Sequence, residues 1–230
     1  MPTYPLTSLY CSDEDLAVRA AGDFGDLVPP DQIKARGIDG TIENGAWAMT
    51  SATTDFAARG VVVGDMVKLW GTKGTVESDR FGPEKPGTWM AVESVATTTL
   101  TLRRKGLAVN VGEPVGGVFD LTSASFIVAT LGPQIERAAR DLNHRFGIDS
   151  ARINRTTGDL YDIDDLREAC ELTVLHKLYW ACSRQKDDDW KIKAAWLKKE
   201  LEEVLARLTI RWGTDGEDRP PTMFIGRCER

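Results

Sequence analysis

The chain has 230 residues, of which 42% are hydrophobic, and a formal net charge of −6. This apolar fraction is enough to bury an ordinary core in one domain or in two small ones. The acidic balance argues against a protein that coats DNA, because phosphate neutralisation needs clustered Lys and Arg. The chain has no apolar run long enough to span a membrane and no signal-peptide pattern near residue 1, so we expect neither membrane insertion nor export.

A short helix is predicted over residues 12–22. Ser12 is a typical N-cap, and the three acidic residues after it fall in the first turn, where the positive end of the helix dipole favours them. The helix is expected to end near Gly22 or Gly25, and the proline-containing residues 28–31 are expected to form a loop.

Residues 45–130 have the composition of a small β-domain. Short runs rich in β-branched and aromatic residues are separated by glycines, and several alternate apolar with polar residues as half-buried strands do. The runs are residues 61–63, 66–70, 89–95, 99–103 and 126–129. Residues 59–105 contain eight basic and five acidic side chains, so this part is basic and the rest of the chain is acidic. We predict a small antiparallel β-barrel-like domain.

Three amphipathic helices are predicted after the β-domain. The first covers residues 132–146, with Pro133 in its first turn and apolar residues at the helical period. The second covers residues 162–184 and has a broad apolar surface, which implies contacts on more than one side. The third covers residues 187–210, with an apolar stripe on one face and charged residues on the other. The short polar connector between the last two predicts an antiparallel helical hairpin.

The last residues, 211–230, are predicted to form an extended arm without a core of its own. Its notable residues are Trp212, Pro220, Pro221, Met223, Phe224 and Ile225. Three consecutive apolar residues suit an anchor that inserts into a groove of a partner. The alternative is that the arm folds back over its own hairpin, with Trp212 and Phe224 filling the core.

The predicted fold class is therefore α+β, a helical bundle interrupted by a β-barrel-like insertion. Residues 1–44 are the N-terminal helix and loop of the helical module, and residues 45–130 are the insertion. Residues 131–210 complete the bundle, and residues 211–230 are the arm. In this scheme the insertion joins two halves of one helical core.

This organisation resembles the head-to-tail adaptor (connector) proteins of tailed bacteriophages and gene transfer agents. The residues that carry the resemblance are YCSDEDL at 10–16, the helix at 135–146, and the hairpin from DDLREAC at 164–170 to residue 210. The stretch DFAARGVVVGDMV at 55–67, with residues 93–95 and 99–102, is similar to a small β-barrel element of several phage neck and tail proteins.

The resemblance implies a structural virion protein at the neck, made in the cytoplasm of the bacterial host. Copies would pack side by side in a homo-oligomeric ring, a dodecamer that matches the portal ring. The ring would dock on the portal protein through the arm and contact the next neck or tail protein. DNA would pass through its channel without specific binding.

Acidic residues crowd around the start of the second long helix and could line that DNA channel. They are Asp159, Asp162, Asp164, Asp165 and Glu168. A modestly acidic wall repels phosphates, which suits a conduit that must not hold DNA. The alternative is that they are helix-start acids that face solvent, favoured there by the helix dipole.

The sequence indicates no enzyme. It contains no GxxxxGK[ST], GxSxG, HExxH or CxxC motif. His144 and His176 both fall in predicted helices, and the four cysteines are scattered, which favours free thiols. We therefore predict no catalytic residue, no metal site and no cofactor.

Several alternatives remain open, among them an uncharacterised enzyme. The chain could be a nucleic-acid-binding β-barrel module, in which aromatic and basic residues contact bases and phosphates. Those residues would be Trp70, Trp89, Arg103, Arg104 and Lys105. It could also be another assembly protein of the phage neck or tail.

Overall fold

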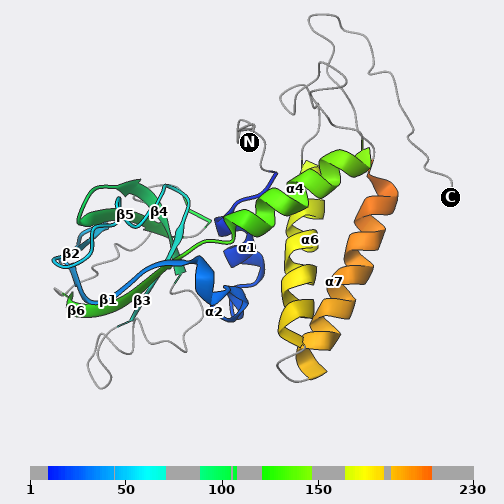
Figure 1. Cartoon of the computed structure of the whole chain (residues 1–230). Coiled ribbons are helices and arrows are strands. Elements are labelled where there is room, and N and C mark those ends of the chain that lie inside the picture. The colour runs from blue at the N-terminus through cyan, green and yellow to red at the C-terminus, as the bar shows by residue number, and fades with distance from the viewer. Residues whose placement is uncertain are drawn as a thin grey trace, which may run out of the picture. The chain divides into compact units, whose positions relative to one another are not determined.

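The computed structural model describes residues 10–43, 45–70, 89–104, 106–107, 121–146, 164–183 and 188–208 (Figure 1). The chain forms two compact units. The barrel unit is Ser12–Leu131, and the helical unit combines Met1–Cys11 with Gly132–Arg230. The chain is thus mixed α+β, as the sequence predicts.

The barrel unit contains a closed, antiparallel six-stranded barrel among the described residues. Its strands are β1 (Ile33–Ile42), β2 (Ala48–Ser51), β3 (Met66–Trp70), β4 (Trp89–Val95), β5 (Thr99–Arg104) and β6 (Leu121–Ala129). They are hydrogen-bonded in the order β1-β2-β5-β4-β3-β6, and β6 pairs with β1 to close the barrel. Each described strand therefore has a neighbouring strand on both sides.

Apolar side chains from alternating strand positions fill the barrel. In β5, for example, Leu100 and Leu102 are fully buried, whereas Thr101 between them is partly exposed. Phe56 and Phe126 pack in the core with ring centroids 5.7 Å apart. Burying side chains of this size stabilises a fold by about 1.5–3 kcal/mol each, before the entropy cost of ordering them.

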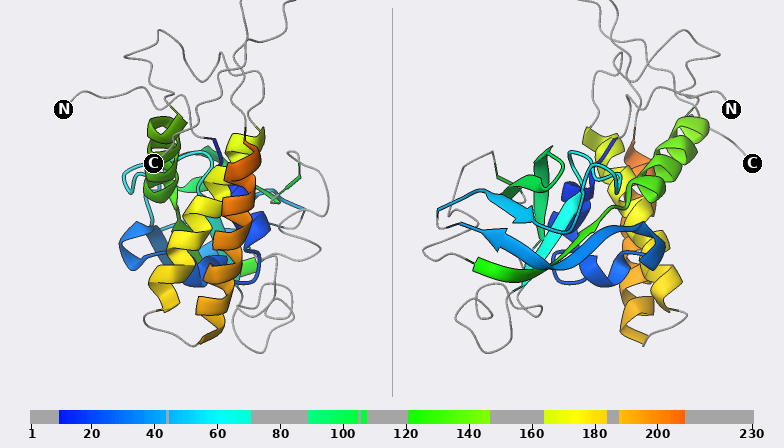
Figure 2. Two further views of the ribbon diagram at one scale, coloured as in Figure 1. Left: turned by 90° about the vertical axis from the view of Figure 1, so that its right-hand side faces the viewer. Right: turned by 60° about the vertical axis from the view of Figure 1, so that its left-hand side comes forward.

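Strands β1 and β6 run side by side along one wall of the barrel (Figure 2). Their register shifts between Gly37 and Gly40, where β1 bends over the ring of Phe126. A Cβ atom at Gly37 would lie 2.5 Å from Cζ of Phe126, so a residue with a side chain does not fit there.

Short helices precede β1 in the barrel unit. They are α1 (Asp13–Arg19), α2 (Phe24–Leu27) and the 3₁₀ helix η1 (Pro30–Gln32). Ser12 caps α1 as predicted, and with Asp15 it forms a capping box. Phe24 of α2 packs edge-on against Trp89 of β4, with ring centroids 5.0 Å apart. These aromatic contacts attach the N-terminal helices to the barrel.

The helical unit contains α4 (Gly132–Phe146), α6 (Asp164–Ser183) and α7 (Asp188–Arg207). Helix α6 packs against both α4 and α7, and α6 and α7 lie side by side in Figures 1 and 2. Contact on two sides explains why α6 buries residues around most of its circumference, including Leu166, Cys170, Val174 and Tyr179. Helix α7 has a single buried stripe.

The structure differs from the predicted domain boundaries at the N-terminal side. Strand β1 begins at Ile33, and residues from Ser12 onward belong to the barrel unit rather than to the helical module. The physical reason is that β1 contains Lys34, Arg36 and Asp39 together with two glycines, which hide the alternation of a strand. Helix α1 packs on β4 and belongs to the barrel unit.

One predicted strand is absent from the described residues, and two predicted segments lie outside them. Residues 61–63 were expected to be a strand, but they form part of a turn that leads to β3. The connector of the predicted hairpin, residues 184–187, and the predicted arm, residues 211–230, lie outside the described residues. The hairpin and the arm therefore stay predictions, although α6 and α7 do pack together.

Candidate interaction surface

The structure describes three of the five predicted channel acids, Asp164, Asp165 and Glu168. Asp159 and Asp162 lie outside the described residues. Asp164 and Asp165 occupy the first turn of α6, and Asp164 is 82% exposed with Arg167 Nη1 3.5 Å from its carboxylate. Exposed acids at this position are favoured by the helix dipole alone, so their placement fits either reading.

Glu168 has a structural partner. Its carboxylate accepts a hydrogen bond of 2.7 Å from the Arg207 guanidinium, which links the first half of α6 to the last turn of α7. A second link joins Lys177 of α6 to Asp141 of α4 at 2.6 Å. Both pairs are substantially exposed, so each adds about 1 kcal/mol or less. Glu168 therefore links α6 to α7, and its role as a channel residue stays a prediction.

The inner face of α7 is buried against its neighbour. Ala194, Leu197 and Val204 are 4% exposed or less. At the N-terminal end of α7, the ring of Trp190 packs on Tyr179 with centroids 5.2 Å apart. The ammonium group of Lys193 lies over both rings, 5.7 Å and 5.6 Å from their centroids. Trp190 therefore packs within the helical unit.

The outer face of α7 carries two large apolar side chains in solvent. Ile192 is 66% exposed and Trp196 is 62% exposed. They are four residues apart, so they stack on one side of the helix, about opposite the buried stripe. Trp180 of α6 is also 52% exposed. We call Ile192 and Trp196 the outer apolar pair.

The outer apolar pair lies within an otherwise charged helix face. The next residues along the face form ion pairs between Lys198 and Glu202, at 3.8 Å, and between Lys199 and Glu203, at 3.9 Å. An apolar centre with a polar rim is the usual composition of a protein interface. Tryptophan is among the residues that contribute most when such an interface forms.

Sequence reasoning missed the outer apolar pair, although a signal was present. The third predicted helix was divided into an apolar stripe and a charged face, and Ile192 and Trp196 fall on the charged face. Apolar residues that contradict the helical period are the ones to examine for a partner.

The predicted anchor residues of the arm, Trp212, Pro220, Pro221, Met223, Phe224 and Ile225, lie outside the described residues. No geometry can be given to the predicted arm.

Two of the five residues of the nucleic-acid alternative, Trp89 and Arg103, are occupied within the barrel unit. Trp89 is 5% exposed and so has no free face for base stacking. Arg103 donates to both carboxylate oxygens of Glu14, to Glu93 at 2.9 Å and to the carbonyl oxygen of Leu107 at 3.2 Å. Trp70 is half-buried against the barrel core. Lys105 lies outside the described residues.

Within the described ranges, no three His, Cys, Asp or Glu side chains are grouped so that they could hold a metal ion. None of the described helices combines the length and apolar character needed to cross a bilayer. Comparison of the chain with protein-family models, curated proteins and solved structures finds no match.

Proposed function

We propose that the protein is a head-to-tail adaptor of a tailed bacteriophage or gene transfer agent, a structural component of the virion neck. Copies would form a ring on the portal protein and leave a channel for DNA. The observation that carries the proposal is the outer apolar pair, Ile192 and Trp196, exposed on the face of α7 opposite its buried stripe. The resemblance of the helical segments to adaptor proteins supports it.

The occupant that we propose for the outer apolar pair is a second copy of the chain. A subunit in a closed ring must present two different faces, one to each neighbour, so it needs an apolar patch that its own fold does not cover. Helix α7 meets this requirement, because one side packs within the unit and the other carries Ile192 and Trp196. Burying them would contribute about 1.5–3 kcal/mol for each side chain.

The portal contact is assigned to the arm, residues 211–230. This assignment comes from the sequence, in which Met223, Phe224 and Ile225 form an apolar anchor next to two prolines. The exposed Asp164 and the half-buried Asp165 are compatible with an acidic channel wall. The ring would then contact the next neck or tail protein on its other side.

The nucleic-acid alternative has weaker support, because Trp89 is buried and Arg103 is bound to two carboxylates. An assembly protein from elsewhere in the neck or tail would also form rings. Binding to the portal separates these possibilities, because only the adaptor must contact it directly.

The test is the mass of complexes in solution, measured by light scattering. The full-length chain and a chain ending at Ile210 would each be mixed with the portal of the same phage or gene transfer agent. The proposal expects the full-length chain to join the portal and the shortened chain to fail. If the full-length chain does not associate with the portal, the adaptor assignment is wrong. If both chains associate equally, the arm is not the anchor.

A further inference from the structure

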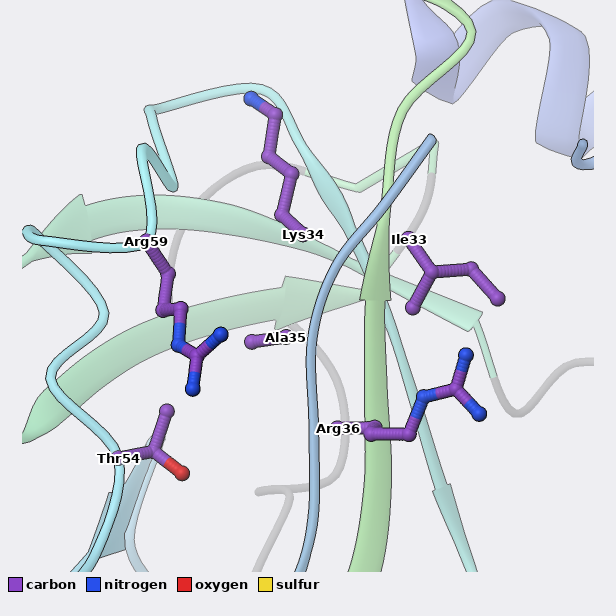
Figure 3. Close-up of a pocket in the computed structure, with 6 residues that line it drawn as sticks. All are labelled: Ile33, Lys34, Ala35, Arg36, Thr54 and Arg59. Carbon is purple, nitrogen blue, oxygen red and sulfur yellow. The ribbon is translucent and has the colours of Figure 1, made fainter. Parts of the chain in front are cut away.

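A pocket on the barrel wall is lined by residues of β1 and of the segment that follows β2. The lining residues are Ile33, Lys34, Ala35, Arg36, Thr54 and Arg59, and the pocket encloses about 130 Å³ (Figure 3). In Figure 3, Thr54 and Arg59 lie on one side of β1, next to Ala35, and the guanidinium of Arg36 lies on the other side. On the Thr54 side of β1 the cationic side chains are Lys34 and Arg59.

The segment that carries Thr54 and Arg59 is held by several hydrogen bonds. The Asp39 carboxylate accepts from the Ser51 hydroxyl, at 2.9 and 3.0 Å, and from the backbone N–H and hydroxyl of Thr53, at 3.0 and 2.9 Å. Asp55 accepts from the N–H of Ala58 at 2.8 Å. Phe56 is fully buried in the barrel core. These contacts fix the backbone on both sides of Thr54 and just before Arg59.

The carboxylates nearest this region already have donors. Lys34 Nζ donates to both oxygens of Asp65 at 2.8 Å, and Asp65 also accepts from the N–H of Val62. By contrast, within the described part of the chain the Arg59 guanidinium and the Thr54 hydroxyl have no hydrogen-bond or ion-pair partner. Arg59 is exposed, so its guanidinium is open to an anion from solvent, and the Thr54 hydroxyl belongs to the same pocket lining.

We propose that this pocket binds a phosphate-type oxyanion, with the Arg59 guanidinium and the Thr54 hydroxyl as its direct donors. Arginine suits this ligand because its planar fork can donate two parallel hydrogen bonds to oxyanion oxygens. Lys34 supplies further positive charge, partly cancelled by Asp65. The source of the anion is either free inorganic phosphate or a phosphodiester of DNA, which offer the same oxygen atoms to the site.

The site is independent of the adaptor proposal, because it lies in the barrel unit and uses neither α7 nor the arm. Arg36 provides a matched control. It is the same residue type and belongs to the same pocket lining, yet Figure 3 shows its guanidinium on the far side of β1 from Thr54. If phosphate bound only through the general positive charge of the region, R59Q and R36Q would weaken binding equally. If it binds at a defined site, only R59Q should weaken binding strongly.

The experiment is calorimetric titration of the full-length protein with inorganic phosphate at constant ionic strength. The variants are R59Q, T54V and R36Q, and circular dichroism would check that each is folded. We expect one saturable site whose affinity falls about tenfold to a hundredfold in R59Q, because a charged hydrogen bond is lost. T54V, which keeps the shape of the side chain, should lose about threefold to tenfold. R36Q should stay within about twofold of the wild type.

A second titration, with a short single-stranded oligonucleotide, identifies the source of the anion. Binding that is lost in R59Q and retained in R36Q assigns the site to a DNA phosphodiester. Phosphate binding without oligonucleotide binding assigns it to the free ion. The absence of saturable phosphate binding in the wild type would overturn the proposal, as would an equal loss in R59Q and R36Q. If R59Q is poorly folded, T54V takes its place: weaker phosphate binding in T54V supports the proposed site, and unchanged binding in T54V contradicts it.

Discussion

The Asp13 carboxylate accepts two hydrogen bonds of 2.6 Å, one from the Thr130 hydroxyl and one from the backbone N–H of Leu131. It therefore joins the first turn of α1 to the residues that follow β6. These are also the two places where the chain enters and leaves the barrel unit, Ser12–Leu131. One buried side chain thus closes the ends of the unit, across 118 residues of sequence.

Protonation of Asp13 should make the stability of the barrel unit depend on pH. Burial raises the pKa of Asp13 to about 6. The hydrogen bonds from Thr130 and Leu131 lower this pKa, but by less than burial raises it. Because the folded-state pKa lies above the unfolded value of 3.8, the folded state holds the proton more tightly. The contribution of this group is fully present below about pH 4 and is lost as the pH rises through about 6. The change over this window is about 3 kcal/mol.

The matched variant is D13N, which resembles the protonated carboxyl and does not titrate. The free energy of unfolding of wild type and D13N would be measured by urea denaturation from pH 4 to pH 8. The difference between them cancels the other titrating groups, and it should shift in favour of D13N as the pH rises. A difference that stays constant over this range would show that Asp13 titrates normally.

Substitution of Gly37 by alanine should destabilise the barrel. The new Cβ would lie 2.5 Å from the Phe126 ring, which is fully buried and cannot move away without disturbing the core. We expect a loss of about 1–3 kcal/mol, as in other overpacked cores. The control is G22A, because a Cβ at Gly22 meets no atom within 4 Å. Urea denaturation that shows equal stability for G37A and the wild type would contradict the described packing.

The pairing of Arg103 with Glu14 and Glu93 predicts a measurable coupling. Glu14 is on α1 and Glu93 is on β4, so Arg103 ties a helix to the barrel wall. R103Q should cost about 1–3 kcal/mol, because it leaves partly buried carboxylates without their cation.

A double-mutant cycle with E14Q tests this contact directly. The two substitutions should be less than additive, since each removes the same ion pair. The exposed pair between Lys199 and Glu203 serves as the control, and K199Q should cost about 0.5 kcal/mol or less. Additive effects of R103Q and E14Q would show that the two side chains do not interact in solution.

Local sequence patterns were sufficient for several elements. The helical period predicts α4, α6 and α7 to within a few residues, and Ser12 predicts the start of α1. Strands β3, β4 and β5 follow from β-branched and aromatic runs. In each case the local sequence and the tertiary environment favour the same structure.

The parts that were missed depend on contacts between distant residues. Strand β1 is a strand because it pairs with β6, for example Ile33 with Ala129, although its own residues do not alternate. Arg103 looked available for nucleic acid until Glu14, 89 residues away, was placed beside it. The exposure of Trp196 likewise becomes evident only from the packing of α7 against α6, which buries the opposite face of α7.

The most direct test of the adaptor account is the mass of the protein with its portal, measured by light scattering for the wild type, W196E and I38E. Ile38 is 76% exposed on β1 and provides an apolar control outside α7. The account predicts that the wild type and I38E form a multi-copy ring on the portal, whereas W196E does not, because a buried carboxylate at the contact between copies is costly. A ring of unchanged mass in W196E, or no association with the portal in the wild type, would contradict it.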